Sequence, residues 1–409
     1  MTRNAVLDDM VKILRDQHAR KLDIVVPATK IRAKDGLLVI SGVEAELTED
    51  GVTTVDGRYQ PTKVCDSGLA EKLRIPGSYL TRLREEGRTD LYDGNVTGLL
   101  QGKQVRRAGG EIEIIHPADG RSFLVRLFRD ENGGTGVARA LLSNKWGGMD
   151  NLDVLMAGVE GINASGVHTE VTDAYLTDRR MYIDFFAPAV TAMAPVLLGG
   201  YRNPFDNEGV TRNHPRNDVE YWRGVAAHEG LGYEPGTEPI VFVGFRLSNS
   251  EVGEGMASVT PLIKIKICRN GLVVTDDTIA HRHIGSRLDD GIVNWSRDTH
   301  KAQLNLIKAK ARDAVVKFLN PEYLQSKITE IEEKAGKPVA KPTDTIKKLG
   351  KQLGYTQDEQ DGILEHFVMG GQLTAGGIVN AVTSFSQTIG DADRANDLDG
   401  SALQVLKLV

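Results

Sequence analysis

Two stretches of the sequence decide the fold: IVFVGFRLSNS at residues 240–250 and MASVTPLIKIKICRNGLVV at residues 256–274. Both are rich in β-branched and aromatic residues, which is typical of strands. Lysine alternates with isoleucine over residues 263–267, so one face of that strand is expected to be basic and the other buried. The Asn, Ser and Gly residues between the stretches favour tight turns. The pattern therefore predicts two long strands closed by turns and a bulge.

Further elements extend this β region in both directions. The segment 111–130 predicts a hairpin whose turn holds Pro117 and Asp119-Gly120, and residues 136–146 predict a third strand. Asp35-Gly36 between apolar runs predicts another hairpin turn. Additional strands are expected at 168–176 and 179–187, and helices at 1–22, 149–164, 296–319 and 321–334.

The expected fold class is α+β, with an antiparallel sheet core, packed helices and a small C-terminal helical unit. Residues 1–100 form an N-terminal helix and hairpin portion, and residues 101–336 the α+β core domain. Residues 337–409 hold a Pro/Lys-rich linker and the C-terminal helical unit, whose helix starts are indicated by Thr356, in a capping box with Glu359, and by Thr374.

Composition excludes several classes of protein. The 409 residues include 50 basic and 56 acidic side chains, a net charge of −6. Two cysteines, Cys65 and Cys268, are too few for a disulfide scaffold or a thiolate zinc site. Asp8 and Asp9 interrupt any signal-peptide core, and no apolar run approaches the roughly 20 residues that span a bilayer. We therefore expect a cytoplasmic protein.

Motifs of the common enzyme classes are absent. The sequence has no P-loop, no HExxH zinc helix and no GxSxG elbow. This lowers the expectation of an enzyme without removing it, and we assign no catalytic residue, metal or cofactor.

Basic residues cluster in three parts of the chain, which suits a protein that tracks phosphates, since each contact releases a condensed counterion. Solvated strand faces scattered over the surface are the alternative interpretation. The predicted nucleic-acid-binding residues are Lys103, Arg106, Arg107, Arg121, Arg126, Arg139, Lys264, Lys266, Arg282, Lys301, Lys308 and Arg312.

An irregular segment at residues 199–239 adds Trp222, next to Tyr221, as a candidate platform for stacking unpaired bases. The alternative is that this aromatic pair anchors the segment to the core. Two of the arginines, Arg126 and Arg139, are flanked by strand residues and could instead be partly buried partners of Glu113, Asp130 or Glu251.

Two other patterns are candidate sites. Asp277, His281 and His283 could hold a metal, because residues two apart in a strand share a face, although structural histidines are the favoured interpretation. Asn249-Ser250-Glu251 with Gly253 and Gly255 could contact a ligand, but turn formation is favoured because these residues stabilise tight turns.

Three segments in fixed order resemble a known family: RALLSNKWGGMDNLDVL at 139–155, GFRLSNSEVGEG at 244–255 and KICRNGLVVTDDTIAHRHIG at 266–285. They are similar to phage- and plasmid-associated proteins that carry domain of unknown function 932. The likeness spans about residues 75–337 and, more weakly, the closing helices. It implies an origin on a mobile genetic element, near replication and recombination genes, and no established activity.

The leading hypothesis is a non-enzymatic DNA-metabolism protein of a phage or plasmid that binds single-stranded DNA without sequence specificity, in a recombination or annealing role. The first alternative is an oligomerising assembly protein that binds phage or host proteins, with the Asp-rich C-terminal unit as a recruiting surface. The second is a metal-dependent nucleic-acid hydrolase acting through Asp277, His281 and His283. A homo-oligomer is expected, and no membrane partner.

Overall fold

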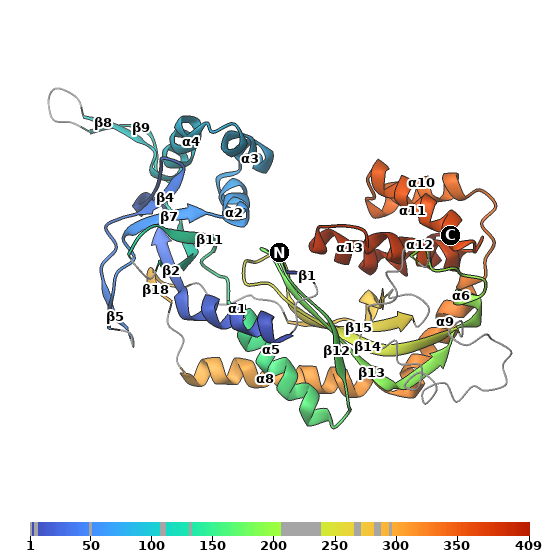
Figure 1. Ribbon diagram of the computed structural model, residues 1–409. Coiled ribbons are helices and arrows are strands. Elements are labelled where there is room, and N and C mark those ends of the chain that lie inside the picture. The colour runs from blue at the N-terminus through green and yellow to red at the C-terminus, as the bar shows by residue number, and fades with distance from the viewer. Residues whose placement is uncertain are drawn as a thin grey trace.

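A computed structural model of the chain describes residues 2–3, 7–48, 51–106, 112–130, 133–205, 239–265, 271–281, 288–293 and 297–409. Within these ranges the chain forms two lobes, each built on a mainly antiparallel sheet with helices packed against it (Figure 1). The predicted α+β class is confirmed, including the helical cluster near the C-terminus. No helix among the described residues is long and apolar enough to cross a membrane.

The N-terminal lobe holds a sheet with the strand order β18-β2-β10-β11-β7-β4-β3. Its strands are β2 (Lys21–Pro27), β3 (Ile31–Lys34), β4 (Leu37–Ile40), β7 (Gly57–Pro61), β10 (Ser122–Phe128), β11 (Gly136–Ser143) and β18 (Gly291–Ile292). All neighbours are antiparallel except β11 and β7, which run parallel. The sheet therefore unites strands from both sides of the expected boundary at residue 100.

Three helices and their apolar side chains cover one face of this sheet: α2 (Lys63–Leu73), α3 (Gly77–Glu85) and α4 (Thr89–Gln101). Short elements complete the lobe: η1 (Ala28–Lys30), β5 (Glu46–Thr48) and β6 (Gly51–Thr53). The predicted turn at Asp35-Gly36 joins β3 to β4, and both of its residues have positive φ, 56° and 75°. This is the conformation that makes Asp-Gly a hairpin signal.

The predicted hairpin over residues 111–130 is wrong. Residues on the two sides of its expected turn belong to different sheets: β9 (Ile112–His116) pairs with β8 (Lys103–Arg106), whereas β10 pairs with β2 and β11. The Pro/Asp/Gly cluster marks a turn in either arrangement, so local residue preferences could not select the strand partner.

The C-terminal lobe holds the second sheet, ordered β1-β12-β13-β14-β15-β16, with β17 also paired to β15. Its strands are β1 (Thr2–Arg3), β12 (Glu170–Leu176), β13 (Met181–Met193), β14 (Ile240–Asn249), β15 (Ala257–Ile265), β16 (Gly271–Val273) and β17 (Ile279–His281), with η4 (Thr275–Asp277) between the last two. The long β14–β15 pair is the one that the opening stretches of the sequence predict.

Helices enclose this sheet on both faces (Figure 1). On the apolar face lie α5 (Asn151–Ser165) and α8 (Arg297–Phe318), which cross closely at Gly161, where an added Cβ would lie 2.5 Å from the Lys308 carbonyl oxygen. The opposite face is covered by α12 (Ala375–Ser386) and α13 (Ala392–Ala402). The remaining helices are α1 (Leu7–Arg20), α6 (Pro195–Leu198), α9 (Pro321–Ala335), α10 (Pro342–Leu353), α11 (Gln357–Gly370) and α14 (Val405–Leu408).

The C-terminal helices share one continuous apolar core with the second sheet. The predicted helix starts are confirmed: Thr356 and Glu359 form a capping box on α11, and the Thr374 hydroxyl accepts from the Gly377 amide at the start of α12. At the start of α2, the Thr62 hydroxyl accepts from the Cys65 amide N–H and caps the helix.

Candidate functional site

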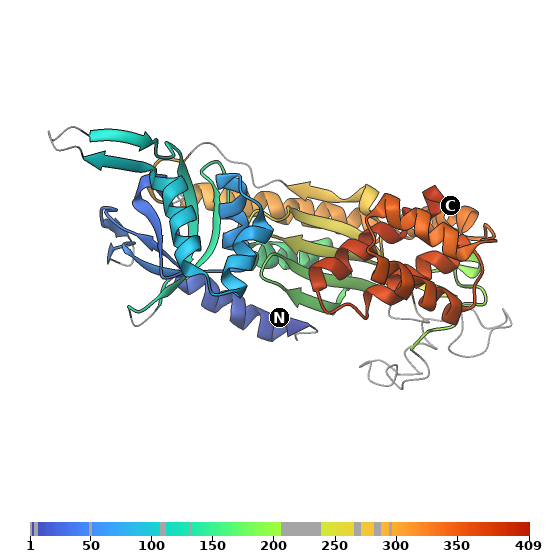
Figure 2. The ribbon, with the colours of Figure 1, turned by 90° about the horizontal axis from the view of Figure 1, so that it is seen from above.

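A two-stranded ribbon projects from the N-terminal lobe. We call β8 and β9 together the arm. Among the described residues they pair only with each other, and they extend away from the body of the lobe (Figures 1 and 2). Every described side chain of β9 is exposed, including Ile112 at 62%, Ile114 at 61% and Ile115 at 41%. A lone two-stranded hairpin is marginally stable in water, and exposed large apolar side chains are typical of a contact surface.

The register of the arm brings charged, polar and apolar positions together along the ribbon. Arg106 pairs with Ile112, Gln104 with Ile114 and Lys103 with His116, with a bulge next to Lys103. Val105 pairs with Glu113, so Arg106 and Ile112 are the one pair of the described ladder that sets a cationic position opposite an isoleucine.

The base of the arm is fixed by backbone contacts. The side-chain amide of Gln101 donates to the backbone carbonyls of Thr29 and Ile31 at 3.0 and 3.1 Å. The Asp119 N–H donates to the Leu100 carbonyl at 3.0 Å. Gly102 has φ of 68°, and an added Cβ would lie 2.4 Å from the His116 carbonyl oxygen, so this position accepts only glycine without distortion.

Cationic side chains gather at this base; we call Lys30, Lys72, Lys103 and Arg121 the arm root. Arg121 forms a bidentate ion pair with Asp119 and donates to the Lys72 carbonyl at 2.6 Å. The Arg121 carbonyl accepts from the Ala28 N–H at 3.0 Å, two residues before Lys30. Among the described residues, Lys30 and Lys103 have no ion-pair partner. The arm root thus carries cationic charge that no carboxylate fully neutralises.

The prediction of nucleic-acid contacts is corrected for two arginines, because the structure buries their side chains. Arg126 is 1% exposed and forms ion pairs with Asp23 at 2.6 Å and Asp150 at 3.0 Å. Arg139 is also buried, with its guanidinium over the Phe128 ring. Neither guanidinium can reach a phosphate outside the fold. For Arg126, the alternative that it is a partner of Glu251 is supported, with the two side chains 3.9 Å apart.

Lys264 is a further correction, because its side chain is only 16% exposed and is held by carboxylates. Its ammonium lies 2.6 Å from Asp173 and 3.8 Å from Asp184, on the face of the second sheet that α12 and α13 cover. The alternation of lysine and isoleucine correctly predicted two different faces for β15, but the basic face is covered by helices rather than by solvent.

The cluster on α8 lies in the other lobe, far from the arm in Figure 1. Lys308 pairs with Glu160 at 2.9 Å and Arg312 with its neighbour Asp313 at 2.8 Å, while Lys301 is exposed. The predicted basic residues therefore do not form one continuous surface. Arg107, Trp222, Lys266 and Arg282 lie outside the described residues, as does the side chain of Arg106.

The predicted metal group at Asp277, His281 and His283 is not assembled by the described residues. Asp277 accepts from the Tyr323 hydroxyl and pairs with Lys327, each at 2.8 Å. Burial raises the pKa of Asp277, but the bonds to Lys327 and Tyr323 outweigh burial and lower the pKa overall. His281 lies on β17, with its side chain outside the description, and His283 lies outside it entirely.

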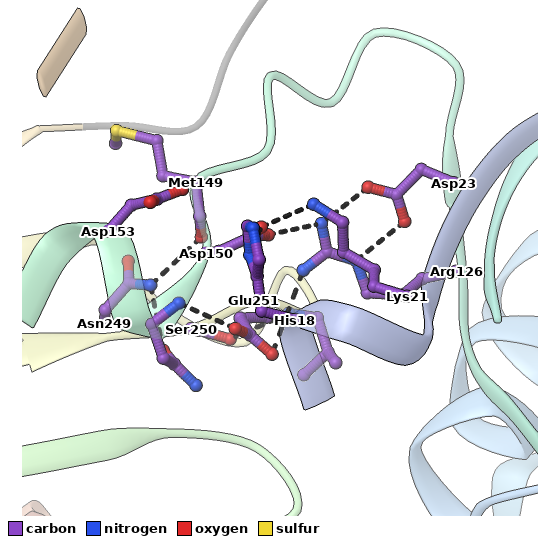
Figure 3. A network of polar contacts seen from close by, with 12 residues as sticks. His18, Lys21, Asp23, Arg126, Met149, Asp150, Asp153, Asn249, Ser250 and Glu251 are labelled. Atoms are coloured by element: carbon purple, nitrogen blue, oxygen red, sulfur yellow. Dashed lines mark hydrogen bonds and ion pairs between the residues drawn. The ribbon is translucent and has the colours of Figure 1, made fainter. Parts of the chain in front are cut away.

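A buried ionic network joins the two lobes (Figure 3). Asp23 and Arg126 come from neighbouring strands of the first sheet, and His18 and Lys21 from the end of α1 and the start of β2. Asp150, ahead of α5, accepts hydrogen bonds from Lys21, Arg126 and His18.

The turn after β14 completes this junction. The Glu251 carboxylate accepts from the backbone N–H of Asn151 at 2.6 Å, and the Asn249 side chain donates to the Met149 carbonyl at 3.1 Å. Ser250 donates to the Arg179 carbonyl at 2.8 Å, which ties the turn to the β12–β13 hairpin. The turn-forming interpretation of Asn249-Ser250-Glu251 is therefore supported, since these side chains bind backbone.

Burial and charge oppose each other in this network. Burial raises the pKa of Asp150, but Arg126, His18 and Lys21 outweigh it and lower the pKa overall. Burial raises the pKa of Glu251, and Arg126 offsets only part of that increase. Burial lowers the pKa of Arg139. The network holds Asp150 ionised and makes Glu251 the carboxyl that protonates most readily.

A polar cavity of about 290 Å³ lies between the second sheet and α12–α13. Arg246 forks onto Asp184 at 2.6 and 2.8 Å and donates to Asn396 at 2.5 Å. Asp399 accepts from Ser386, and burial raises the pKa of Asp399 to about 6. Asp393 and Asp397 of the Asp-rich segment contact Tyr182 and Arg180. These three aspartates therefore bind the sheet of their own chain.

Local sequence patterns do not predict the carboxylates of the junction or the packing of α12 and α13 over the second sheet. Asp23, Asp150 and His18 carry no local motif, and their partners lie more than 100 residues away. No protein-family model, curated protein or solved structure matches this chain. The resemblance to the family with domain of unknown function 932 stays a prediction, and function rests on the geometry of the sites.

Proposed function

We propose that this protein binds nucleic acid, single-stranded DNA in particular, without sequence specificity, through the arm and the arm root. One observation carries the proposal: a projecting ribbon bearing three exposed isoleucines stands on a cationic base. In line with the family resemblance, the setting is the DNA metabolism of a phage or plasmid in the host cytoplasm.

The two kinds of side chain have separate roles in this proposal. The four cations of the arm root, Lys30, Lys72, Lys103 and Arg121, hold backbone phosphates, which gives affinity without sequence information. The isoleucines pack against bases, as apolar side chains of minor-groove proteins do when they insert between base steps. A single strand presents its bases already unstacked, so binding it avoids the cost of opening a duplex.

Salt dependence of binding tests the proposal. With four phosphate contacts, raising salt from about 50 to about 200 mM weakens single-strand binding about 50-fold. A Lys30→Ala/Lys103→Ala variant removes two contacts, so the same change in salt weakens binding only about sevenfold. The measurement is fluorescence anisotropy of a labelled oligonucleotide.

A matched control is available on α8. Lys308→Ala/Arg312→Ala removes the same charge from paired residues of the other lobe, and its salt dependence should equal that of the wild type. Equal losses in the two variants would mean that net charge, rather than the arm root, sets the affinity. Absence of binding at 50 mM salt would refute the proposal.

A second candidate function is self-assembly through the arm, which the same exposed isoleucines favour. In that case a second copy of the chain covers Ile112 and Ile114. Light scattering without nucleic acid distinguishes the two functions: Ile112→Ser/Ile114→Ser lowers the particle mass if the arm assembles copies, and leaves it unchanged if the arm serves nucleic acid alone.

A further inference from the structure

Three metal-ligand side chains, His18, Asp150 and Asp153, meet beside the junction network, and a fourth, His300, contacts Asp153. His18 ends α1, Asp150 precedes α5, Asp153 lies in the first turn of α5 and His300 lies in the first turn of α8. His18, Asp150 and Asp153 offer ligand atoms that all lie within 4.8 Å of one another. Figure 3 shows these three residues around one point at the edge of the network.

We propose that His18, Asp150 and Asp153, with His300 as the fourth ligand, bind one divalent transition-metal ion of the Zn²⁺ type. This site is independent of the arm and goes beyond the proposed nucleic-acid binding.

The spacing of the donors suits a small tetrahedral ion. Metal–ligand bonds of about 2.0–2.2 Å place neighbouring ligand atoms about 3.4 Å apart in a tetrahedron. His18 Nδ1 lies 3.2 Å from Asp150 Oδ2, and His300 Nε2 lies 3.1 Å from Asp153 Oδ2. Both pairs are close to that edge length. The His300 imidazole lies outside the group of three, so it must turn toward the other donors to complete the tetrahedron.

The surroundings provide both support and access. Asp150 is held in place by Arg126, as outer groups orient the ligands of metal sites. The imidazoles of His18 and His300 are 45% and 44% exposed, so an ion can enter from solvent on the histidine side. Mixed imidazole and carboxylate donors favour Zn²⁺ over Mg²⁺, which prefers oxygen ligands and retained waters.

Lys21 competes for the site. Its ammonium contacts the same oxygen of Asp150 that His18 contacts, and it must move away when a dication binds. The side chain is partly exposed and long, so it can turn to solvent. Lys21→Met therefore tightens metal binding, by at least about fivefold, because a unit charge a few Å away costs about 1 kcal/mol even in water.

The test is Zn²⁺ titration of the full chain against a chromophoric chelator, without nucleic acid. We expect one ion per chain at the site and at least about 100-fold weaker binding in His18→Gln and Asp153→Asn, more than the loss of an outer-shell partner costs. These two side chains lie at the rim of the network, so their variants retain its Arg126–Asp23 pair. His168→Gln, at another surface histidine–carboxylate pair, serves as the matched control.

Three outcomes would overturn the inference. The first is no Zn²⁺ binding at micromolar concentration. The second is unchanged affinity in both His18→Gln and Asp153→Asn. The third is loss of binding only in His281→Gln or His283→Gln, which would place the ion at the other histidine pair. Tighter binding in Lys21→Met together with loss in Asp153→Asn supports it.

Discussion

Replacing Arg126 with methionine tests the interpretation of this residue as the ionic centre of the junction between the lobes. The guanidinium faces three carboxylates that are mostly or fully buried: Asp23, Asp150 and Glu251. It also lies 4.9 Å from the Trp146 ring. Methionine fills a similar volume but leaves the carboxylates without their shared cation.

Removing one partner of a buried ion pair costs about 3–5 kcal/mol of unfolding free energy. Because three carboxylates lose their cation at once, we expect Arg126→Met to fall at the upper end of that range. The loss should shrink at low pH. Burial raises the pKa of Glu251, so this carboxyl takes up a proton first when the cation is gone.

The assay is urea unfolding followed by far-UV circular dichroism and by tryptophan fluorescence, with Trp146 as the local probe. Arg121→Met is the matched control: it removes an exposed arginine paired with Asp119 and should cost no more than about 1 kcal/mol. A loss below about 1 kcal/mol in Arg126→Met would refute the reasoning, because the carboxylates would then have other compensation.

Three further predictions concern other parts of the fold. Burial raises the pKa of Asp399 to about 6, so ionisation of this carboxyl destabilises the fold as the pH rises from about 4 through 6. Asp399→Asn should therefore add on the order of 2–3 kcal/mol to the free energy of unfolding above that pH window and nothing below it. Thermal melts across pH measure the difference. Gly161→Ala should cost about 1–3 kcal/mol by pushing α5 from α8, whereas Gly94→Ala, with open space around its Cβ position, should stabilise α4 by up to about 1 kcal/mol in the same urea assay. Burial raises the pKa of the Cys65 thiol, so Cys65→Ser should leave the rate of native-state thiol labelling unchanged and differ from wild type only after unfolding.

Local patterns in the sequence predicted many elements and few of their partners. The Asp35-Gly36 turn, the Thr356 capping box and the long β14–β15 strands depend on neighbouring residues, and all three are found. β9 pairs with β8 rather than with β10. This choice depends on competition between strands for the same partner, and the composition of the segment 111–130 does not determine its outcome.

The candidate sites show the same division. The sequence around a basic residue does not reveal whether solvent, a carboxylate or a helix will cover it. The sequence therefore predicts nucleic-acid contacts for Arg126 and Lys264, although carboxylates of the fold bind both side chains. Lys103 and Arg121 remain at an exposed arm root because, within the part of the chain that the structure describes, β8 and β9 form a separate two-stranded sheet. His18 and Asp150 are 132 residues apart, and only the fold brings them together.

Hydrogen exchange of the full chain, with and without a single-stranded oligonucleotide at about 50 mM salt, tests nucleic-acid binding by the arm most directly. Free β8 and β9 form an unsupported ribbon, so their amides should exchange quickly and become protected when the oligonucleotide is added. The account predicts this protection in residues 103–106 and 112–116, and none in α8. Protection of α8 with an unchanged arm would contradict it.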